Sequence, residues 1–137
     1  MLAPACLRAY NGTMTDQPSA RDHVHAWMEK YQAAWASNQP GDIRDLFTED
    51  ARYEKRPGDP EAWMGQDGIV DGWLAARDEP ADWTFMWKLL GADADTAFVQ
   101  GVTTYSAGRP SYDNLWVIRF DGEGRAAAFT EWFMERA

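Results

Sequence analysis

Apolar residues recur at helical spacing in three segments of the chain. In the longest segment, residues 19–37, the apolar stripe consists of Val24, Trp27, Met28, Tyr31 and Trp35. Ser19 and Asp22 have the spacing of a helix N-cap and its first turn. Shorter stripes occupy residues 43–47 and 66–77. The pattern therefore predicts three helices, of which the first is the longest.

Apolar and polar residues alternate in five further segments, which is typical of strands with one buried face. These segments are residues 51–56, 83–88, 96–105, 112–120 and 126–134. The turn-forming residues 121–124 join the last two strands as a hairpin. Three helices around one early strand, followed by a four-strand meander, predict a single α+β domain over residues 19–137. Residues 1–18 are expected to form a loose N-terminal tail.

Strand alternation also assigns side chains to faces, because charged residues on a strand mostly point to solvent. Placing Arg119 outward sends Asn114 and Trp116 toward the helices, and placing Phe129 inward brings Glu131 with it. On the strand over 96–105, Gly101, Thr103 and Tyr105 share one face, and the choice of this face as the inward one rests partly on a family resemblance. The opposite face then carries Leu115, Val117, Trp132 and Met134. That face is apolar for a solvated surface, so we expect a second subunit to cover it.

The aromatic content is higher than an ordinary core of this size requires. The chain holds 8 Trp, 5 Tyr and 6 Phe, and an excess of Trp is typical of interfaces and cavity walls. We therefore predict a ligand cavity lined by Tyr31, Trp35, Tyr53, Trp63, Thr103, Tyr105, Asn114, Trp116 and Phe129. For Tyr31, Trp35 and Trp73 a core position is the stronger interpretation, because aromatic residues at helical spacing usually belong to the core. Tyr53 and Trp63, near the loop end, are better candidates for the lining.

Charge and cysteine content exclude several classes of function. The net charge of −9 disfavours binding to nucleic acid or to anionic membranes. Cys6 is the only cysteine, so no intrachain disulfide or cysteine metal site is expected, and a reducing cytoplasm fits. No apolar run approaches the length of a membrane span. His23 and His25 are two residues apart on a helix and cannot share a metal ion as an i, i+4 pair does. We expect no metal and no cofactor.

The order of elements, together with three short motifs, resembles the nuclear-transport-factor-2-like superfamily. The motifs are LFTEDARY at 46–53, Trp63-x-Gly65-x-x-x-Ile69, and FTEWF at 129–133. The nearest branch is the SnoaL-like proteins, relatives of polyketide cyclases, ketosteroid isomerases and limonene-type epoxide hydrolases. The resemblance covers roughly residues 20–134. It implies a cone-shaped domain with a curved antiparallel sheet around a long N-terminal helix, a pocket at the open end, and usually a homodimer through the sheet.

Glu131 is the candidate for chemistry. A carboxylate inside an aromatic cavity is costly unless it is paired or protonated, and desolvation raises its pKa toward the range that a general acid or base needs. The resemblance implies a role for Glu131, because in the epoxide hydrolases an acid at the corresponding place on the final strand helps to activate a water molecule. Two other interpretations stay open. Glu131 is a structural residue bonded to Asn114, Tyr53 or a Trp N–H, or it points outward after a register slip of one residue.

Asn114 is the natural partner, since its amide can donate to an oxyanion, although an Asn near a strand start often only satisfies a loop. The known enzymes also differ from this chain. At the places of the epoxide hydrolases' middle-strand Arg and Asp the chain has Gly101 and Thr103. The second acid of the ketosteroid isomerases and the histidine of the polyketide cyclases have no counterpart.

The sequence thus supports two hypotheses, because the fold alone does not fix the function. The first is a SnoaL-like pocket protein for a small, largely apolar or cyclic metabolite, with isomerase, cyclase or hydrolase chemistry on Glu131. The alternative is a non-catalytic module that uses the fold for dimerisation or for binding a ligand or partner.

Overall fold

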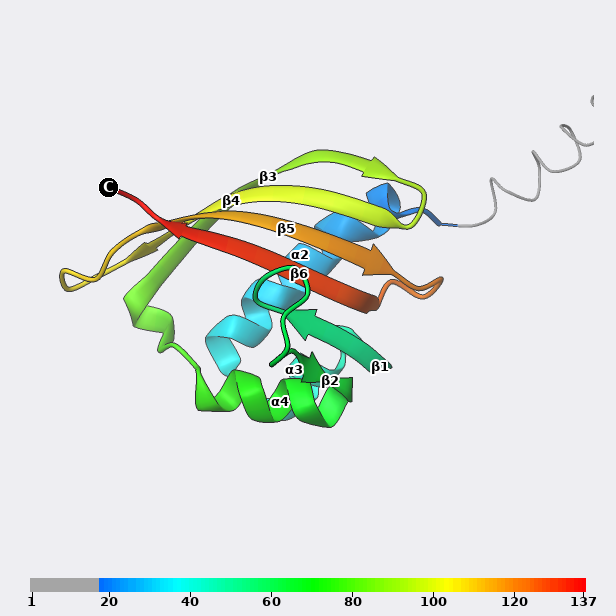
Figure 1. The fold of residues 1–137 in the computed structure, drawn as a ribbon, viewed down its shortest axis with the longest axis horizontal. Helices are drawn as coiled ribbons and strands as arrows, with labels where there is room; N and C mark the ends of the chain where they lie inside the picture. The colour runs from blue at the N-terminus through cyan, green and yellow to red at the C-terminus, as the bar shows by residue number, and fades with distance from the viewer. Residues whose placement is uncertain (1–17) are drawn as a thin grey trace, which may run out of the picture.

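A bent six-stranded sheet curves over one long helix (Figure 1). The computed structural model describes residues 18–137. The expected tail over residues 1–18, with Cys6, lies outside the described residues except for Pro18. The helices are α2 (Ala20–Ser37), α3 (Pro40–Arg44), α4 (Gly65–Ala75) and the 3-10 turn η1 (Pro80–Asp82). The strands are β1 (Phe47–Glu54), β2 (Trp63–Met64), β3 (Trp83–Asp93), β4 (Thr96–Tyr105), β5 (Tyr112–Phe120) and β6 (Ala126–Glu135).

The sheet has the strand order β2-β1-β6-β5-β4-β3. Strands β3 to β6 form the meander that the sequence predicts, with antiparallel pairing throughout. The early strand β1 joins the sheet beside the last strand and runs parallel to it. The α+β cone with a long N-terminal helix and two shorter helices is therefore confirmed (Figure 1).

The long helix α2 begins and ends where its sequence predicts. The Asp22 carboxylate accepts hydrogen bonds from the backbone N–H of Ser19 at 2.9 Å and from its hydroxyl at 3.0 Å. At the other end Asn38 adopts a left-handed conformation with φ 53°, and its N–H donates to the Ala34 carbonyl at 2.8 Å. This end is then tied to α4, because the Trp73 indole N–H donates to the Asn38 side chain at 3.1 Å. The helix is thus held at both ends.

Trp27 occupies the centre of the core, where α2 meets the concave face of the sheet. It is 2% exposed, and its indole N–H donates to the Leu46 carbonyl at 2.9 Å. Its ring packs against Phe47, Phe120 and Phe129 at centroid separations of 5.8–6.1 Å. A buried Trp with its N–H satisfied contributes a large apolar area at little polar cost.

Two predicted boundaries are wrong near the start of the sheet. The helix expected over 43–47 ends at Arg44, and the strand expected from Ala51 begins at Phe47. The cause is tertiary, because Phe47 pairs with Ala126 on β6 and the Ala126 N–H donates to the Leu46 carbonyl at 2.8 Å. Pairing with a strand distant in sequence overrides a short helical pattern.

Burial along β4 and β5 follows the alternation expected from the sequence. Gly101, Thr103, Asn114 and Trp116 are buried, while Arg119 is exposed. Gly101 has no room for a side chain, because a Cβ placed there would lie 2.6 Å from the Phe85 ring. That ring stacks on Trp116 at 4.9 Å, so Gly101 fixes the position of two aromatic rings.

We expect Gly101→Ala to lower the free energy of unfolding by about 1–3 kcal/mol, because the added methyl group displaces the Phe85 ring from Trp116. Gly91→Ala is the matched control, since a Cβ at Gly91 meets nothing within 4 Å. Urea unfolding followed by Trp fluorescence measures both. An equal, small change in the two variants would contradict the packing role of Gly101.

Candidate functional site

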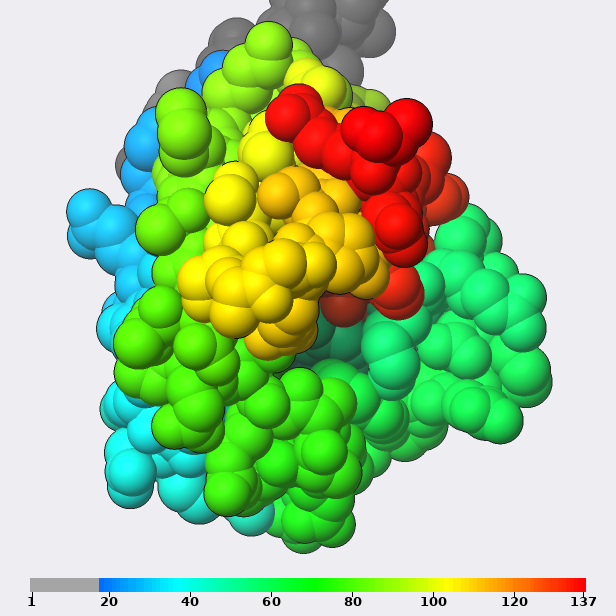
Figure 2. All heavy atoms as spheres, turned by 90° about the vertical axis from the view of Figure 1, so that its left-hand side faces the viewer, coloured from blue at the N-terminus to red at the C-terminus, as the bar shows by residue number. Residues whose placement is uncertain are grey.

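A cavity of about 270 Å³ opens at the end of the cone. Figure 2 shows the hollow between the turn after β4, the C-terminal end of α4, the segment after β1 and the end of β6. Its volume is close to the lower end of small-molecule sites, which span roughly 300–1,000 Å³. The cavity therefore has room for a small molecule of one or two rings.

Glu131 lies at the wall of this cavity, on β6 directly across from Trp116 on β5. It is partly buried and faces inward, as the alternation of β6 predicts. The Tyr53 hydroxyl donates a hydrogen bond to its Oε1 at 3.1 Å. No described residue donates to Oε2. One carboxylate oxygen is thus held in place by a hydrogen bond from Tyr53, and the other receives none of standard geometry from the described residues.

Burial raises the pKa of Glu131 to about 7. The Tyr53 hydroxyl, the Lys55 ammonium and the Trp116 indole N–H act in the opposite direction, because each stabilises the carboxylate. Desolvation outweighs these three contributions, since no cation forms an ion pair with Glu131 among the described residues. A carboxyl with this pKa exchanges a proton readily at neutral pH, which is the requirement for general acid or base catalysis.

Two tyrosines extend the hydrogen-bond chain from Glu131 toward the helix. Tyr31, on α2, and Tyr53, on β1, have their hydroxyl oxygens 2.9 Å apart. Because Tyr53 donates to Glu131, its oxygen accepts from Tyr31, and the chain has one direction. Burial, together with the nearby Glu131 charge, raises the pKa of both hydroxyls well above the usual range. Both tyrosines therefore stay neutral hydrogen-bond donors. Among the three hydrogen-bonded residues, Glu131 is the one that titrates near neutral pH.

Two polar groups in the cavity wall have unused hydrogen-bonding capacity. The buried indole N–H of Trp116 makes no hydrogen bond of standard geometry with a described residue, although it lies near enough to Glu131 to stabilise the carboxylate. Asn114 accepts a hydrogen bond from the Thr103 hydroxyl at 2.7 Å, and no described residue accepts from its amide nitrogen. A buried donor without an acceptor costs free energy that a ligand oxygen can recover. No hydrogen bond joins Asn114 to Glu131, so the expected partnership of these two residues is wrong and Tyr53 takes that place.

Asp78 ties together the rim of the cavity. Its carboxylate accepts from the Tyr105 hydroxyl at 2.9 Å and from the Trp35 indole N–H at 3.2 Å. Arg109, on the turn after β4, lies 3.3 Å from the same carboxylate and stacks over the Tyr105 ring at 3.9 Å. The Asn38 side chain also donates to the Asp78 carbonyl at 3.0 Å. The α4–η1 segment, α2 and the β4–β5 turn are thus joined at one residue.

The structure brings all the residues predicted for the site to this cavity, with one exception. Phe129 is fully buried and packs against Tyr31, Tyr53 and Trp116 at 4.6–5.7 Å, so it supports the lining rings from behind. Tyr31 is both a core residue and a lining residue.

Sequence reasoning missed the charged residues of the lining, namely Lys55, Arg77, Asp78 and Arg109. Strand alternation could have found Lys55, because it is two residues after Tyr53 and shares its face. The other three residues lie in connecting segments, where no periodicity indicates the direction of a side chain.

Two absences hold for residues 18–137. No group of three or more His, Cys, Asp or Glu side chains is placed to hold a metal ion in this part of the chain. Within the same range, no helix has the length and apolar character needed to cross a bilayer.

A curved sheet around a long N-terminal helix is the fold of the nuclear-transport-factor-2-like proteins. A family model described as the SnoaL-like domain matches residues 20–133. The chain therefore belongs to the SnoaL-like family. No curated protein matches it by sequence.

Solved structures share the fold at low sequence identity. A nuclear-transport-factor-2-like protein of unknown function from Burkholderia xenovorans superposes with a TM-score of 0.67 at 14% identity, over 85% of this chain and 87% of that one. A SnoaL-like protein from Agrobacterium tumefaciens gives 0.64 at 19%, over 82% and 97%. A ketosteroid isomerase-like protein from Erwinia carotovora gives 0.59 at 21%, over 83% and 95%. At this sequence identity the similarities establish the fold. The activity has to be inferred from the residues of the cavity.

We expect the free energy of unfolding of the wild type to fall, relative to Glu131→Gln, as the pH rises from about 5 to about 8. Between the ordinary pKa of 4.5 and about 7 the folded protein keeps a proton that the unfolded chain releases, so its advantage is lost through this window. The full difference is about 3 kcal/mol at most. Urea titrations of both proteins at several pH values measure it. If the difference in free energy of unfolding between the two proteins does not change with pH, Glu131 has an ordinary pKa.

Proposed function

We propose that this protein binds a small, largely apolar cyclic molecule in its cavity and moves a proton on it through Glu131, as an isomerase, cyclase or hydrolase of the acid–base type does. The observation that carries the proposal is the carboxyl of Glu131, which is partly buried in the aromatic cavity, has a pKa raised to about 7, and accepts a hydrogen bond of standard geometry at one oxygen only among the described residues. The resemblance of the fold to a ketosteroid isomerase-like protein is consistent with this chemistry.

The geometry supports the following sequence of proton movements. The ring system of the ligand lies between the aromatic walls, and an acidic C–H next to its carbonyl approaches Oε2 of Glu131. The carboxylate takes that proton, and the electron pair of the C–H bond forms an enolate. The amide nitrogen of Asn114 can donate to the enolate oxygen. Glu131 then returns the proton to the same carbon or, where a C=C bond is conjugated with the enolate, to the far carbon of that bond. Tyr53 holds the carboxylate in place throughout.

Proton abstraction can be measured with β-tetralone, a two-ring ketone, by following the exchange of its α-protons for deuterium by NMR. We expect the wild-type protein to accelerate exchange above the buffer rate. Glu131→Gln should reduce the protein-dependent rate by about 10²–10⁴-fold, because it removes the base while keeping the acceptor for Tyr53. The Kd of β-tetralone should change little.

Glu29→Gln on the exposed face of α2 is the matched control, with the same substitution far from the cavity lining. Its exchange rate should equal that of the wild type. If Glu131→Gln exchanges as fast as the wild type, Glu131 is not the base. If β-tetralone binds none of the proteins, the proposal of a pocket for cyclic molecules is wrong for this class of probe.

The alternative function, a non-catalytic binding module, is favoured by the hydrogen bond from Tyr53, which gives Glu131 a structural partner. In that case the cavity still takes a ligand, and Glu131 orients it by hydrogen bonding. The single Cys6 favours a reducing compartment such as the cytoplasm for either function.

We also propose that two copies associate through the outer face of the sheet. That face carries the partly exposed Leu115, Val117 and Trp132, and Met134 is 59% exposed at its edge. The same face continues onto β3, where Met86 is 76% exposed. An apolar area of this kind on a pleated surface is typical of a two-fold interface between subunits.

Sedimentation velocity tests the association. We expect the wild type to be a dimer and Val117→Lys to dissociate, since a charge at the centre of the face cannot be buried without a partner. Ala33→Lys places the same charge on the exposed side of α2 and should stay dimeric. A wild-type protein that sediments as a single monomeric species would exclude this interface.

A further inference from the structure

The charge of the cavity lining is opposite to that of the protein as a whole. The chain has 22 acidic and 13 basic residues, with a net charge of −9. Around the cavity, three cations, Lys55, Arg77 and Arg109, stand against two carboxylates, Asp78 and Glu131. Side chains from separate segments of the chain thus bring an excess of positive charge to one small opening. A charge contrast of this kind selects ligands by the sign of their charge.

Among the three cations, Lys55 has the most clearly defined surroundings. Its ammonium nitrogen lies 3.7 Å from the centre of the Trp63 ring, within the range of a cation–π contact. Lys55 forms no ion pair with any described residue, although it is near enough to Glu131 to lower the pKa of that carboxyl. A partly buried ammonium without a paired carboxylate has capacity left for an anion.

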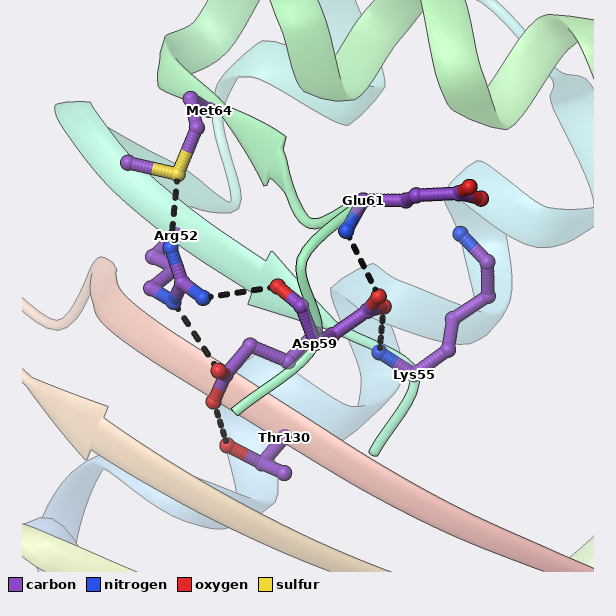
Figure 3. Close-up of polar contacts among 7 residues, drawn as sticks. Arg52, Lys55, Asp59, Glu61, Met64 and Thr130 are labelled. Carbon is purple, nitrogen blue, oxygen red and sulfur yellow. Dashed lines mark hydrogen bonds and ion pairs between the residues drawn. The ribbon is translucent and has the colours of Figure 1, made fainter. Parts of the chain in front are cut away.

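The segment after β1 holds Lys55 in place from outside the cavity (Figure 3). The buried carboxylate of Asp59 accepts from the backbone N–H of Lys55 at 3.1 Å and of Glu61 at 2.8 Å. Arg52 donates to the Asp59 carbonyl at 3.0 Å and to Glu54 at 3.0 Å. Figure 3 shows the Lys55 side chain leaving the Asp59 carboxylate on the side where the Glu61 side chain lies. The backbone at Lys55 is therefore fixed, while its ammonium group forms no ion pair with a described residue.

The other two cations differ in how far they are already neutralised. Arg109 is paired with Asp78 at 3.3 Å, so most of its charge is balanced. Arg77 is exposed and forms no ion pair among the described residues. When Glu131 is ionised, its charge and that of Asp78 leave one of the three positive charges uncompensated. A ligand with a single negative charge completes the balance, and a dianion exceeds it.

We propose that the cavity takes a small ring compound with one carboxylate group, which Lys55 binds at the mouth with Arg77 and Arg109 beside it, while the ring system lies between the aromatic walls. The inference rests on the proposed function, since it assumes that a cyclic molecule enters this cavity. It adds the chemical class of that molecule. The carboxylate at the mouth directs the opposite end of the ligand toward Glu131.

Isothermal titration with naphthoate and naphthamide tests the proposal, because the two probes share one ring system and differ in charge. At low ionic strength we expect the wild type to bind naphthoate about tenfold more tightly than naphthamide, as expected for a hydrogen-bonded charge pair. Added salt should reduce the ratio of the two Kd values. Lys55→Met keeps the packing on Trp63 and should bring this ratio close to one, with the Kd of naphthamide unchanged.

Lys30→Met is the matched control, because it makes the same substitution on the exposed face of α2 and changes the net charge equally. The ratio of the Kd values of naphthamide and naphthoate for Lys30→Met should equal that of the wild type. The Lys55→Met comparison is repeated in a Glu131→Gln background, where the loss of preference should persist, since Lys55 pairs with the ligand carboxylate whether or not Glu131 is charged.

The outcomes separate the two proposals. If naphthamide binds the wild type as tightly as naphthoate does, the carboxylate inference is wrong while the pocket for cyclic molecules stands. A preference that survives Lys55→Met, or that Lys30→Met also removes, equally overturns the assignment to Lys55. If neither probe binds, the proposed function fails together with this inference.

Discussion

The packing of one helix's aromatic stripe against the concave face of the sheet is the constraint on which the rest of the structure depends. Trp27 fills the space between α2 and the sheet completely, with its N–H satisfied by Leu46. One turn later Tyr31 still packs on Phe129 but presents its hydroxyl to Tyr53. A further turn on, Trp35 stands at the rim, stacked on Trp83 at 3.8 Å. The stripe thus passes from closed core to open cavity along a single helix, since the sheet bends away from it.

The cavity exists because its walls are braced by contacts that do not fill it. Asp78 joins three segments at the rim, and Asp59 fixes the segment that carries Lys55. Gly101 leaves room for the Phe85 ring, which in turn supports Trp116. Rigid aromatic side chains lose little conformational entropy on packing, so they can border an opening without collapsing into it. Such a cavity is preorganised for a ligand, which lowers the cost of binding.

Burial and hydrogen bonding act on Glu131 in opposite directions, and their balance sets its chemistry. Desolvation alone favours the protonated acid, whereas Tyr53, Lys55 and the Trp116 indole favour the carboxylate. The result is a pKa near 7, at which both forms are populated at neutral pH. An anion that pairs with Lys55 would withdraw one of the stabilising charges. The proposed carboxylate site and the proposed acid–base group would therefore be coupled through Lys55.

The sequence alone determined the order of the three helices, the early strand and the four-strand meander, the N-cap of α2 at Ser19, the limits of β4 and β5, and the inward face of β6 with Glu131. These features depend on local periodicity and capping, which are properties of neighbouring residues. The tertiary structure alone decided that Phe47 begins a strand, that Phe129 lies behind the cavity wall, and that Tyr53 rather than Asn114 bonds Glu131. It also placed Lys55, Arg77, Asp78 and Arg109 around one opening. Contacts between segments far apart in sequence, such as β1 with β6, leave no periodic pattern, and the charge of the site depends on them.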